Sequence, residues 1–349
     1  MKDYLKVYKA KLHVLSPTFV GSGKEISKKE YRLSYADQKV IVYDPAKFYQ
    51  LIAKNNKTRQ YEDFLLNEKV ADLYSWLKNN RLNFDEINDA VRYTVDFGDS
   101  FKIIRTHIME FSKDAYGNPY VPGSSLKGIL RTILLDYEIR NDTDRFADKS
   151  NAKMIETEVF NTCGKDKDNL SNAVNDVLQG LIVSDSKPLK NSDLVLCQKI
   201  DLNIEKQENK LNIMRECIKP GTAIEFDITI DTSICKYDSG LIMKAINEFN
   251  NMYYECFLSK FDFEQSPDDT VYLGGGVGFV AKTYIYPLLG YKKGLKETQN
   301  ILQKSFKRHG HFKDIKIGVS PHILKCTRYQ GSRYQMGMCK FTMTEVKES

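Results

Sequence analysis

Residues 122–131, Pro-Gly-Ser-Ser-Leu-Lys-Gly-Ile-Leu-Arg, have the types and spacing of an anion-binding helix start. Ser124 or Ser125 is the expected N-cap, and apolar residues after them recur with the 3.6-residue period of a helix. Lys127, Arg131 and the glycine between them are each unfavourable at this place in a helix. A bound phosphate would explain them, since it accepts both cations and approaches closely at a glycine. The alternative is a solvated helix start with scattered charge.

A second segment, residues 271–283 (Val-Tyr-Leu-Gly-Gly-Gly-Val-Gly-Phe-Val-Ala-Lys-Thr), is rich in glycine. It partly matches a dinucleotide fingerprint and a Walker A loop, but it lacks the surrounding parallel βαβ series and the second Walker glycine. We predict instead a turn in which Gly274, Gly275, Gly276 and Gly278 offer backbone groups to phosphate, with help from Lys282. Plain turn geometry is the alternative.

Composition fits a soluble globular chain: of 349 residues, 42% are hydrophobic and 28% charged. No apolar run is long enough for a transmembrane helix, and the first residues carry no apolar signal core. The seven cysteines are scattered and odd in number, which favours reduced thiols over a disulfide framework. We therefore expect a cytoplasmic protein without membrane contact.

Positive charge is concentrated at the two ends of the chain. Residues 282–333 hold twelve Lys/Arg and two acids, and the first 35 residues hold eight Lys/Arg and three acids. Tyrosines and phenylalanines lie among the cations of the later segment, among them Tyr286, Phe306 and Phe312. Single-stranded nucleic acid uses this mixture, with cations for phosphates and rings for bases. A lysine-rich solvated surface is the alternative.

No catalytic or metal-binding constellation emerges from the sequence. None of the five histidines joins cysteines or acids at a zinc spacing, so we expect no metal and no cofactor. The Ser124-x-x-Lys127 pair lacks the companion motifs of a serine hydrolase. His107 could act as a general base in RNA cleavage, but no partner is visible nearby, and a structural histidine is the simpler interpretation.

The alternation of strands and helices, without long parallel βαβ runs, predicts an α+β fold of two ferredoxin-like units. The predicted division lies between residues 1–190 and 191–349, with an all-helical insertion over about 45–95. The expected strands are 9–20, 31–35, 39–43, 101–109, 181–184, 194–204, 211–218, 222–230, 322–328 and 335–343. The expected helices beyond the first motif are 45–53, 61–66, 70–77, 84–93, 239–260 and 298–307. The second and third strands should form a hairpin, and so should the last two.

The helix-start motif at 122–131 closely resembles the signature of RAMP proteins, the repeat-associated RNA-binding subunits of CRISPR systems, and the 274–278 loop resembles their glycine-rich loop. Residues 15–23 (Leu-Ser-Pro-Thr-Phe-Val-Gly-Ser-Gly), the helical block and the ending around 324–340 are similar to one branch. That branch is the large RAMP subunit of type III-A Csm effector complexes at the 3′ end of the guide RNA.

This resemblance implies two ferredoxin-like (RRM-like) RAMP domains and a non-catalytic RNA-binding subunit that caps the RAMP backbone and supports maturation of the guide RNA (crRNA). The implied partners are the crRNA, neighbouring Csm-type backbone subunits, the small helical subunit and host nucleases. Carried over by position, Ser124, Ser125, Lys127 and Arg131 match the first motif, and Gly274, Gly275, Gly276 and Gly278 match the loop.

The backbone subunits of such complexes cut target RNA with an acidic residue in an early loop. Residues 21–25 read Gly-Ser-Gly-Lys-Glu in the comparable region and lack that aspartate. We therefore expect no target-cleaving activity. A crRNA-trimming endoribonuclease and a structural cap with little RNA contact are the two alternatives.

Overall fold

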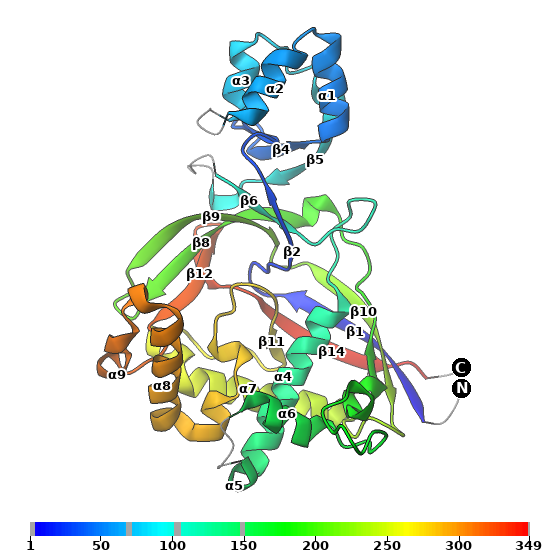
Figure 1. The fold of residues 1–349 in the computed structure, drawn as a ribbon, viewed down its shortest axis with the longest axis vertical. Coiled ribbons are helices and arrows are strands. Elements are labelled where there is room, and N and C mark those ends of the chain that lie inside the picture. The colour runs from blue at the N-terminus through cyan, green and yellow to red at the C-terminus, as the bar shows by residue number, and fades with distance from the viewer. Residues whose placement is uncertain (1–3, 68–71, 101–105, 147–150, 348–349) are drawn as a thin grey trace.

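The computed structural model describes residues 4–67, 72–100, 106–146 and 151–347. These residues form a mixed α+β protein in which helices cover one side of a curled sheet and a smaller lobe projects from the opposite end of the molecule (Figure 1). The expected α+β class is confirmed. No helix within these ranges is both long and apolar enough to span a bilayer. All seven cysteines are free thiols, as their spacing predicts.

The first sheet holds five antiparallel strands in the order β11 (Thr270–Tyr272), β14 (Met338–Glu345), β1 (Leu5–Val14), β10 (Ala223–Asp231) and β7 (Leu181–Val183). Along β1, the buried Tyr8, Ala10, Leu12 and Val14 alternate with more exposed residues, the period expected when one face is covered. Two helices that contact each other cover that face, α4 (Gly123–Asn141) and α7 (Ser239–Cys256) (Figure 1).

The strands of this sheet come from the start, the middle and the end of the sequence. The elements follow along the chain as β1, α4, β7, β10, α7 and β14, and the four strands among them lie side by side in the order fourth, first, third, second. Leu12 of β1 is opposite both Ile224 of β10 and Phe341 of β14. Because both neighbours of β1 lie beyond residue 190, the predicted division there is not a boundary between sheets.

The second sheet is mixed and has nine strands. Seven run in the order β2 (Gly21–Ile26), β6 (Ile108–Phe111), β9 (Glu208–Ile218), β8 (Leu194–Asn203), β5 (Val91–Asp96), β4 (Lys39–Tyr43) and β3 (Tyr31–Ser34). The other two are β12 (Ile323–Tyr329), which pairs with β8, and β13 (Ser332–Gln335), which pairs with β12. The predicted β3–β4 hairpin is confirmed.

The predicted pairing of the last two strands is wrong. β12 turns back through Gln330 and Gly331, both with positive φ, and pairs with the short β13. A two-residue loop with positive φ at both positions matches the twist of a tight hairpin. The chain then leaves this sheet, and β14 pairs with β1 and β11 in the first sheet.

Three short helices between β4 and β5 give the projecting lobe a core of its own: α1 (Pro45–Lys54), α2 (Thr58–Leu66) and α3 (Leu73–Asn79). The start of α1 follows from its sequence, because Asp44 accepts a hydrogen bond from the backbone N–H of Lys47 (2.9 Å) and Pro45 is the first helical residue. The residues buried there are mostly aromatic or aliphatic and include Phe48, Ile52, Tyr61, Phe64, Trp76 and Ile87.

The predicted helix at 84–93 is wrong. Residues Asn88–Ala90 form a single 3₁₀ turn, and the chain then enters β5, where Tyr93 and Val95 are buried in alternation. The predicted strand at 101–109 begins outside the described residues, and its described end lies in β6. The remaining α-helices are α5 (Thr143–Phe146), α6 (Ala152–Phe160), α8 (Ile285–Ser305, kinked at Gly290) and α9 (Asp314–Ile317).

Candidate nucleic-acid interface

Three segments that are far apart in the sequence meet at the glycine-rich loop. The N–H of Gly275 donates to the carbonyl of Phe19 (2.7 Å), and the N–H of Leu273 donates to the carbonyl of Gly337 (2.7 Å). The N–H of Gly337 in turn donates to the carbonyl of Pro17 (3.1 Å). The opening segment, the loop and the closing segment quoted above therefore form one hydrogen-bonded site.

Packing explains two of the loop glycines. At Gly274 (φ +86°) a Cβ would lie 2.1 Å from the carbonyl oxygen of Phe19, and at Gly276 (φ +110°) it would lie 2.8 Å from Nη1 of Arg215. Both positions therefore exclude side chains for steric and conformational reasons. Gly278 has no atom within 4 Å of such a Cβ, so the surface beside it is open.

Arg215 of β9 lies against this loop and was not among the predicted site residues. Its Nη1 is 3.4 Å from the carbonyl oxygen of Gly275, and its guanidinium carbon is 5.0 Å from the ring centroid of Phe19. The Nε of Arg215 is buried without a hydrogen-bond partner. Among the described residues, no carboxylate forms an ion pair with Arg215.

Two lysines share the electrostatic surroundings of Arg215. Burial and the Arg215 charge lower the pKa of Lys282, and burial, Lys325 and Arg215 lower the pKa of Lys199 despite the nearby Asp201. Lowered lysine pKa values mean that the ammonium form is disfavoured where these side chains lie. An anion placed among Lys199, Arg215 and Lys282 would relieve that cost. A single basic residue in an alternating strand belongs to no motif, so neither Lys199 nor Arg215 could be recognised as a site residue from the sequence.

The start of α4 differs from the prediction. The helix begins at Gly123, and its N–H donates to Oδ1 of Asp185 (2.8 Å), so neither Ser124 nor Ser125 is the cap. A Cβ at Gly123 would lie 2.4 Å from the carbonyl oxygens of Val183 and Ser184, which accounts for the glycine. The carboxylate of Asp185 thus accepts the hydrogen bond of the first N–H of the helix, the group that was expected to bind a phosphate.

The two cations of α4 have different surroundings. Arg131 is bound by Asp176 (Nη1 to Oδ2, 2.6 Å) and Glu156 (Nη2 to Oε2, 3.2 Å), and its guanidinium carbon is 4.3 Å from the ring centroid of Phe160. Lys127 is half-buried and has no ion pair within the described part of the chain; burial and the Arg131 charge lower its pKa, although Asp176 opposes the shift. The expectation that both side chains are free for an anion is therefore corrected for Arg131.

The predicted residues thus fall into two groups. Gly274, Gly276 and Lys282 gather around Arg215, whereas Lys127 and Arg131 gather around Asp176. Ser124 is exposed and Ser125 half-buried on the first turn of α4. Burial, and to a smaller extent the charges of Glu297 and Glu156, raise the pKa of Tyr284, which lies two residues beyond Lys282. Helix α4, which carries Lys127 and Arg131, packs against α8, which begins at Ile285 just after Lys282, so the two groups lie on adjacent elements.

The two basic ends of the chain also differ. On β1, lysines pair with acids of the neighbouring strands: Lys9 with Asp227 (2.5 Å) and Lys11 with Glu225 (3.0 Å). In the later segment, the pairs are Lys325 with Asp201, Arg328 with Glu208 and Arg333 with Glu208. Nine cations of residues 282–333 have no such pair in the described structure: Lys282, Lys292, Lys293, Lys296, Lys304, Lys307, Arg308, Lys313 and Lys316.

Of the aromatic rings expected to stack on bases, some are engaged within the fold and others are exposed. Tyr286 is buried, and its hydroxyl donates to the carbonyl of Ser320 (2.7 Å). Tyr291 donates to the carbonyl of Gly318, and Lys260 lies over its ring. Phe306 and Phe312 are 49% and 64% exposed, so these two rings are the accessible ones beside the unpaired cations.

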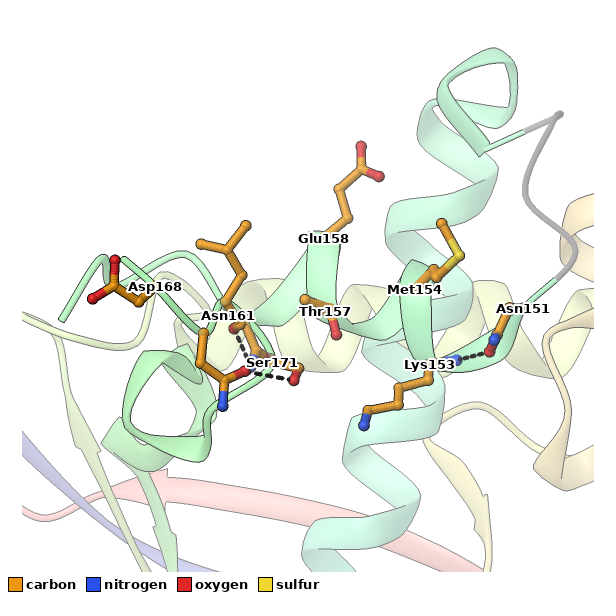
Figure 2. Close-up of a pocket in the computed structure, with 10 residues that line it drawn as sticks. Asn151, Lys153, Met154, Thr157, Glu158, Asn161, Asp168 and Ser171 are labelled. Atoms are coloured by element: carbon orange, nitrogen blue, oxygen red, sulfur yellow. Dashed lines mark hydrogen bonds between the residues drawn. The ribbon is translucent and has the colours of Figure 1, made fainter. Parts of the chain in front are cut away.

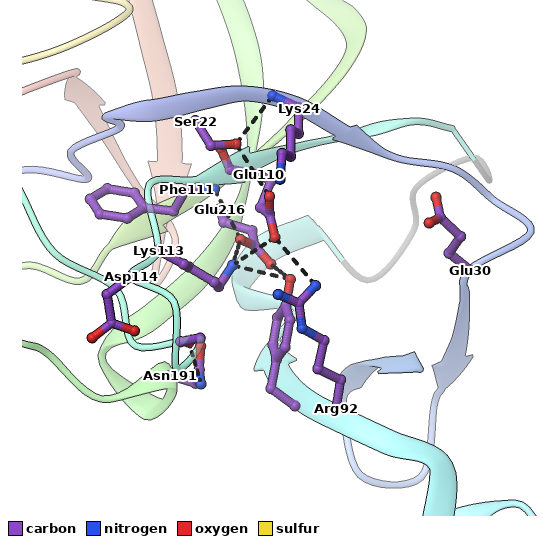
Figure 3. A network of polar contacts seen from close by, with 12 residues as sticks. Ser22, Lys24, Glu30, Arg92, Glu110, Phe111, Lys113, Asp114, Asn191 and Glu216 are labelled. Atoms are coloured by element: carbon purple, nitrogen blue, oxygen red, sulfur yellow. Dashed lines mark hydrogen bonds and ion pairs between the residues drawn. The ribbon is translucent and has the colours of Figure 1, made fainter. Parts of the chain in front are cut away.

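A buried polar network joins β5, β6 and β9 beside the early loop (Figure 3). Glu216 accepts hydrogen bonds from Tyr93 (2.8 Å), the N–H of Phe111 (3.0 Å) and Lys113 (2.5 Å). Burial and Glu216 raise the pKa of Tyr93 strongly, so this hydroxyl stays protonated. Because these donors occupy both oxygens of Glu216, the carboxylate serves to hold strands together and not as a free general base.

His107 lies on the surface, 3.9 Å from the carboxylate of Glu25, with its side chain 58% exposed. The sequence had shown no acid beside it. A pocket of about 720 Å³ lies elsewhere, between α6 and the loop at 161–171, and it includes none of the predicted site residues (Figure 2). Most of its lining residues are polar types, but apolar atoms make up most of its surface, and Met154 and Leu170 are exposed there.

One titratable cluster could not be recognised from the spacing of residues along the sequence. His311, Asp314 and His322 place ligand atoms within 4.8 Å of one another. The spacing of three and eight residues does not match a zinc motif, and only the return of the chain to β12 brings His322 to the other two.

Comparison with known proteins gives a consistent family. The sequence model of the RAMP superfamily matches residues 11–310. The chain is 28% identical to the "CRISPR system Cms protein Csm5" of Mycobacterium tuberculosis (strain CDC 1551 / Oshkosh), covering 99% of this chain and 100% of that protein. It is 29% identical to the protein of the same name from Streptococcus thermophilus, covering 99% of each.

Solved structures share the fold. One is a chain of a cryo-EM structure of a Csm–crRNA–target RNA ternary complex of a type III-A CRISPR-Cas system, with a TM-score of 0.66, 20% identity, and coverage of 97% of this chain and 100% of that chain. Another is the crystal structure of T. onnurineus Csm5, with a TM-score of 0.61, 19% identity, and coverage of 95% and 99%.

Proposed function

Because the chain belongs to the RAMP superfamily, we propose that it is a non-catalytic RNA-binding subunit of a type III-A CRISPR (Csm) complex. Relatives named Csm5 that match along nearly the whole chain support this assignment, as does the likeness to a chain of a Csm–crRNA–target RNA complex. On this proposal the protein works in the cytoplasm and binds the crRNA, the Csm-type backbone subunits and the small helical subunit.

The observation that carries the RNA-binding role is the group of cations around the glycine-rich loop. Together with burial, the Arg215 charge lowers the pKa of both Lys199 and Lys282, and Arg215 and Lys282 have no carboxylate partner in the described structure. Phosphates of a guide strand would supply the missing negative charge. Gly278 leaves an open surface where a backbone can approach.

The first motif contributes in part. Ser124, Lys127 and the exposed Gly128 form a surface turn of α4 on which RNA can lie. Arg131 contributes on this proposal by holding α6 and Asp176 in place beside Lys127, since its own charge is already balanced. Gly275 and Ser125 contribute through their backbones, since their N–H groups donate to the carbonyls of Phe19 (2.7 Å) and Pro122 (2.9 Å).

We also propose that the first sheet with α4 and α7 is a ferredoxin-like RAMP domain. Its βαββαβ order and its strand arrangement support this, although its elements come from both sides of residue 190. The second sheet would then be the second RAMP domain, with α1, α2 and α3 inserted into it. The position at the 3′ end of the crRNA, and a role in its maturation with host nucleases, rest on the resemblance to the terminal large subunit.

The test is a double substitution, Arg215→Ala with Lys282→Ala, in the assembled complex. Guide RNA that copurifies with the complex should fall at least tenfold, and the remaining binding should depend less steeply on salt. The matched control is Lys9→Ala with Lys11→Ala, which removes the same charge from residues that are paired on β1.

Two results would replace the proposal. Equal RNA retention by both double variants, with no crosslinks to this chain, would favour the structural cap. Cleavage of labelled repeat RNA by the purified chain, abolished by His107→Ala, would favour the trimming enzyme.

A further inference from the structure

We propose that His311, Asp314 and His322 form a binding site for a divalent transition metal of the zinc type, which fastens residues 306–322 to the start of β12. The proposal concerns the chain itself and does not depend on RNA binding. Imidazole nitrogens and a carboxylate oxygen are ligands that zinc takes in proteins, and three protein ligands are sufficient when a water or hydroxyl completes the tetrahedron.

The ligand atoms converge on one buried point. Nδ1 of His311 lies 3.0 Å from Oδ2 of Asp314, and Nδ1 of His322 lies 2.5 Å from Oδ1 of the same carboxylate. Ligands of a tetrahedral zinc ion stand roughly 3.3 Å apart, given bonds of about 2.0–2.2 Å. The two histidine–aspartate distances therefore need to lengthen by less than about 1 Å to accept the ion, and all three ligand atoms already lie within 4.8 Å of one another.

The burial of these residues is unusual for their types. Asp314 has no exposed surface, and the side chain of His311 is 7% exposed, that of His322 19%. A buried carboxylate is costly unless hydrogen bonds and positive charge compensate it, and two neutral imidazoles and Ser320 supply hydrogen bonds but no charge. A divalent cation between the three groups supplies it, and each imidazole then keeps its single proton on Nε2.

The surrounding segment lacks an apolar core of its own. Between the end of α8 and Gly318 the chain makes only short turns, and the fully buried residues in them are His311 and Asp314. Phe306, Phe312 and Ile315 are 49%, 64% and 50% exposed. Metal ligation is a known substitute for a hydrophobic core in small structural units.

A second contact fits the role of an outer ligand partner. The hydroxyl of Ser320 donates to Oδ2 of Asp314 at 2.6 Å. Such hydrogen bonds orient ligating carboxylates and strengthen metal binding. His309 is exposed, and its ring centroid is 6.2 Å from that of His311. Its ring makes no contact with Asp314 in the described structure, so His309 serves as a control histidine outside the site.

The experiment uses the purified full chain, stripped with a chelator and titrated with zinc chloride in the absence of RNA. We expect one tightly bound zinc ion per chain that survives gel filtration. Cobalt(II) in its place should give the intense visible absorption of tetrahedral coordination, and zinc should raise the thermal midpoint as its concentration rises. A chain that retains no zinc after gel filtration would overturn the proposal, whatever the variants do.

Three variants locate the ion. His322→Gln and Asp314→Asn should each weaken zinc affinity at least about 100-fold, whereas His309→Gln should leave it unchanged. His322→Gln is the more informative because its ring is the least buried of the three ligands, so folding is better preserved. Loss of zinc only in His309→Gln, or equal affinity in all three, would refute the assigned ligands.

Discussion

The start of α4 and the glycine-rich loop were predicted from the same kind of evidence, cations and glycines in a surface turn, yet their surroundings differ. At α4, Asp185 occupies the first N–H of the helix and Asp176 binds Arg131. At the loop, Arg215 is beside Lys282 without a carboxylate partner in the described structure. A cation in a sequence motif indicates a bound anion only where no acid of the folded chain pairs with it. Because such acids are distant in sequence, the motif alone does not show whether the cation is paired.

The largest expected effect is a loss of stability when the packing of the glycine-rich loop against the segments around Phe19 and Gly337 is disturbed. Gly274→Val should lower the free energy of unfolding by about 3 kcal/mol or more, because the side chain would combine a strained φ with a clash against the carbonyl of Phe19. Gly278→Ala, where space is open, should cost only about 1 kcal/mol. Urea unfolding of the purified chain measures both, and similar losses at the two positions would mean that the loop does not pack as described.

Single substitutions of the cations should separate the loop from the start of α4 by their effects on RNA affinity. Arg215→Ala should weaken binding of a crRNA 3′ fragment about tenfold and reduce the slope of affinity against salt by roughly one ion. Lys127→Ala should have a smaller effect of the same kind, and Arg131→Ala should have the least effect on affinity. Filter binding over a series of salt concentrations gives all three values. An Arg131 effect larger than that of Arg215 would reverse the ranking of the two regions.

Substitution of Arg131 should instead change the free energy of unfolding. Arg131→Ala removes contacts to Asp176, Glu156 and Phe160 and should lower the free energy of unfolding by about 1–2 kcal/mol, a modest value because the side chain is 30% exposed. Arg131→Lys keeps the charge but loses the bidentate geometry and should recover only part of the loss. Thermal unfolding of the two variants beside Lys127→Ala makes the measurement.

The smallest effect is expected on β1. Hydrogen bonds from Lys187 and Lys11 lower the pKa of Glu225 to about 2, so its stabilising pairs are intact above the ordinary carboxyl pKa near 4.5 and are lost as the pH falls from there toward 2. Glu225→Gln should therefore lower the thermal midpoint slightly at pH 7–8, where the pairs are intact, and the difference from the wild type should disappear as the pH falls toward 2. A change in RNA binding at neutral pH would show that β1 belongs to the interface.

Local sequence signals predicted the elements that depend on neighbours along the chain. The Asp44-Pro45 start of α1 and the β3–β4 hairpin are of this kind. The prediction of a helix at 84–93 is wrong because the spacing of its apolar residues also fits a 3₁₀ turn followed by a strand. Only the pairing of that strand with β4 distinguishes the two. Arg215 and the His322–Asp314 contact could not be predicted, since each is produced by strands that meet across more distant sequence.

The central position of β1 bears on how the chain is made. Its two neighbours are contributed by residues 223–231 and 338–345, so β1 stays without its second partner until more than 300 further residues have been translated. Contacts over such separations form slowly, and exposed strand edges favour aggregation in the interval. Loss of β14 alone would leave β1 beside a single neighbour, β10, and would leave β11 without the strand that joins it to this sheet.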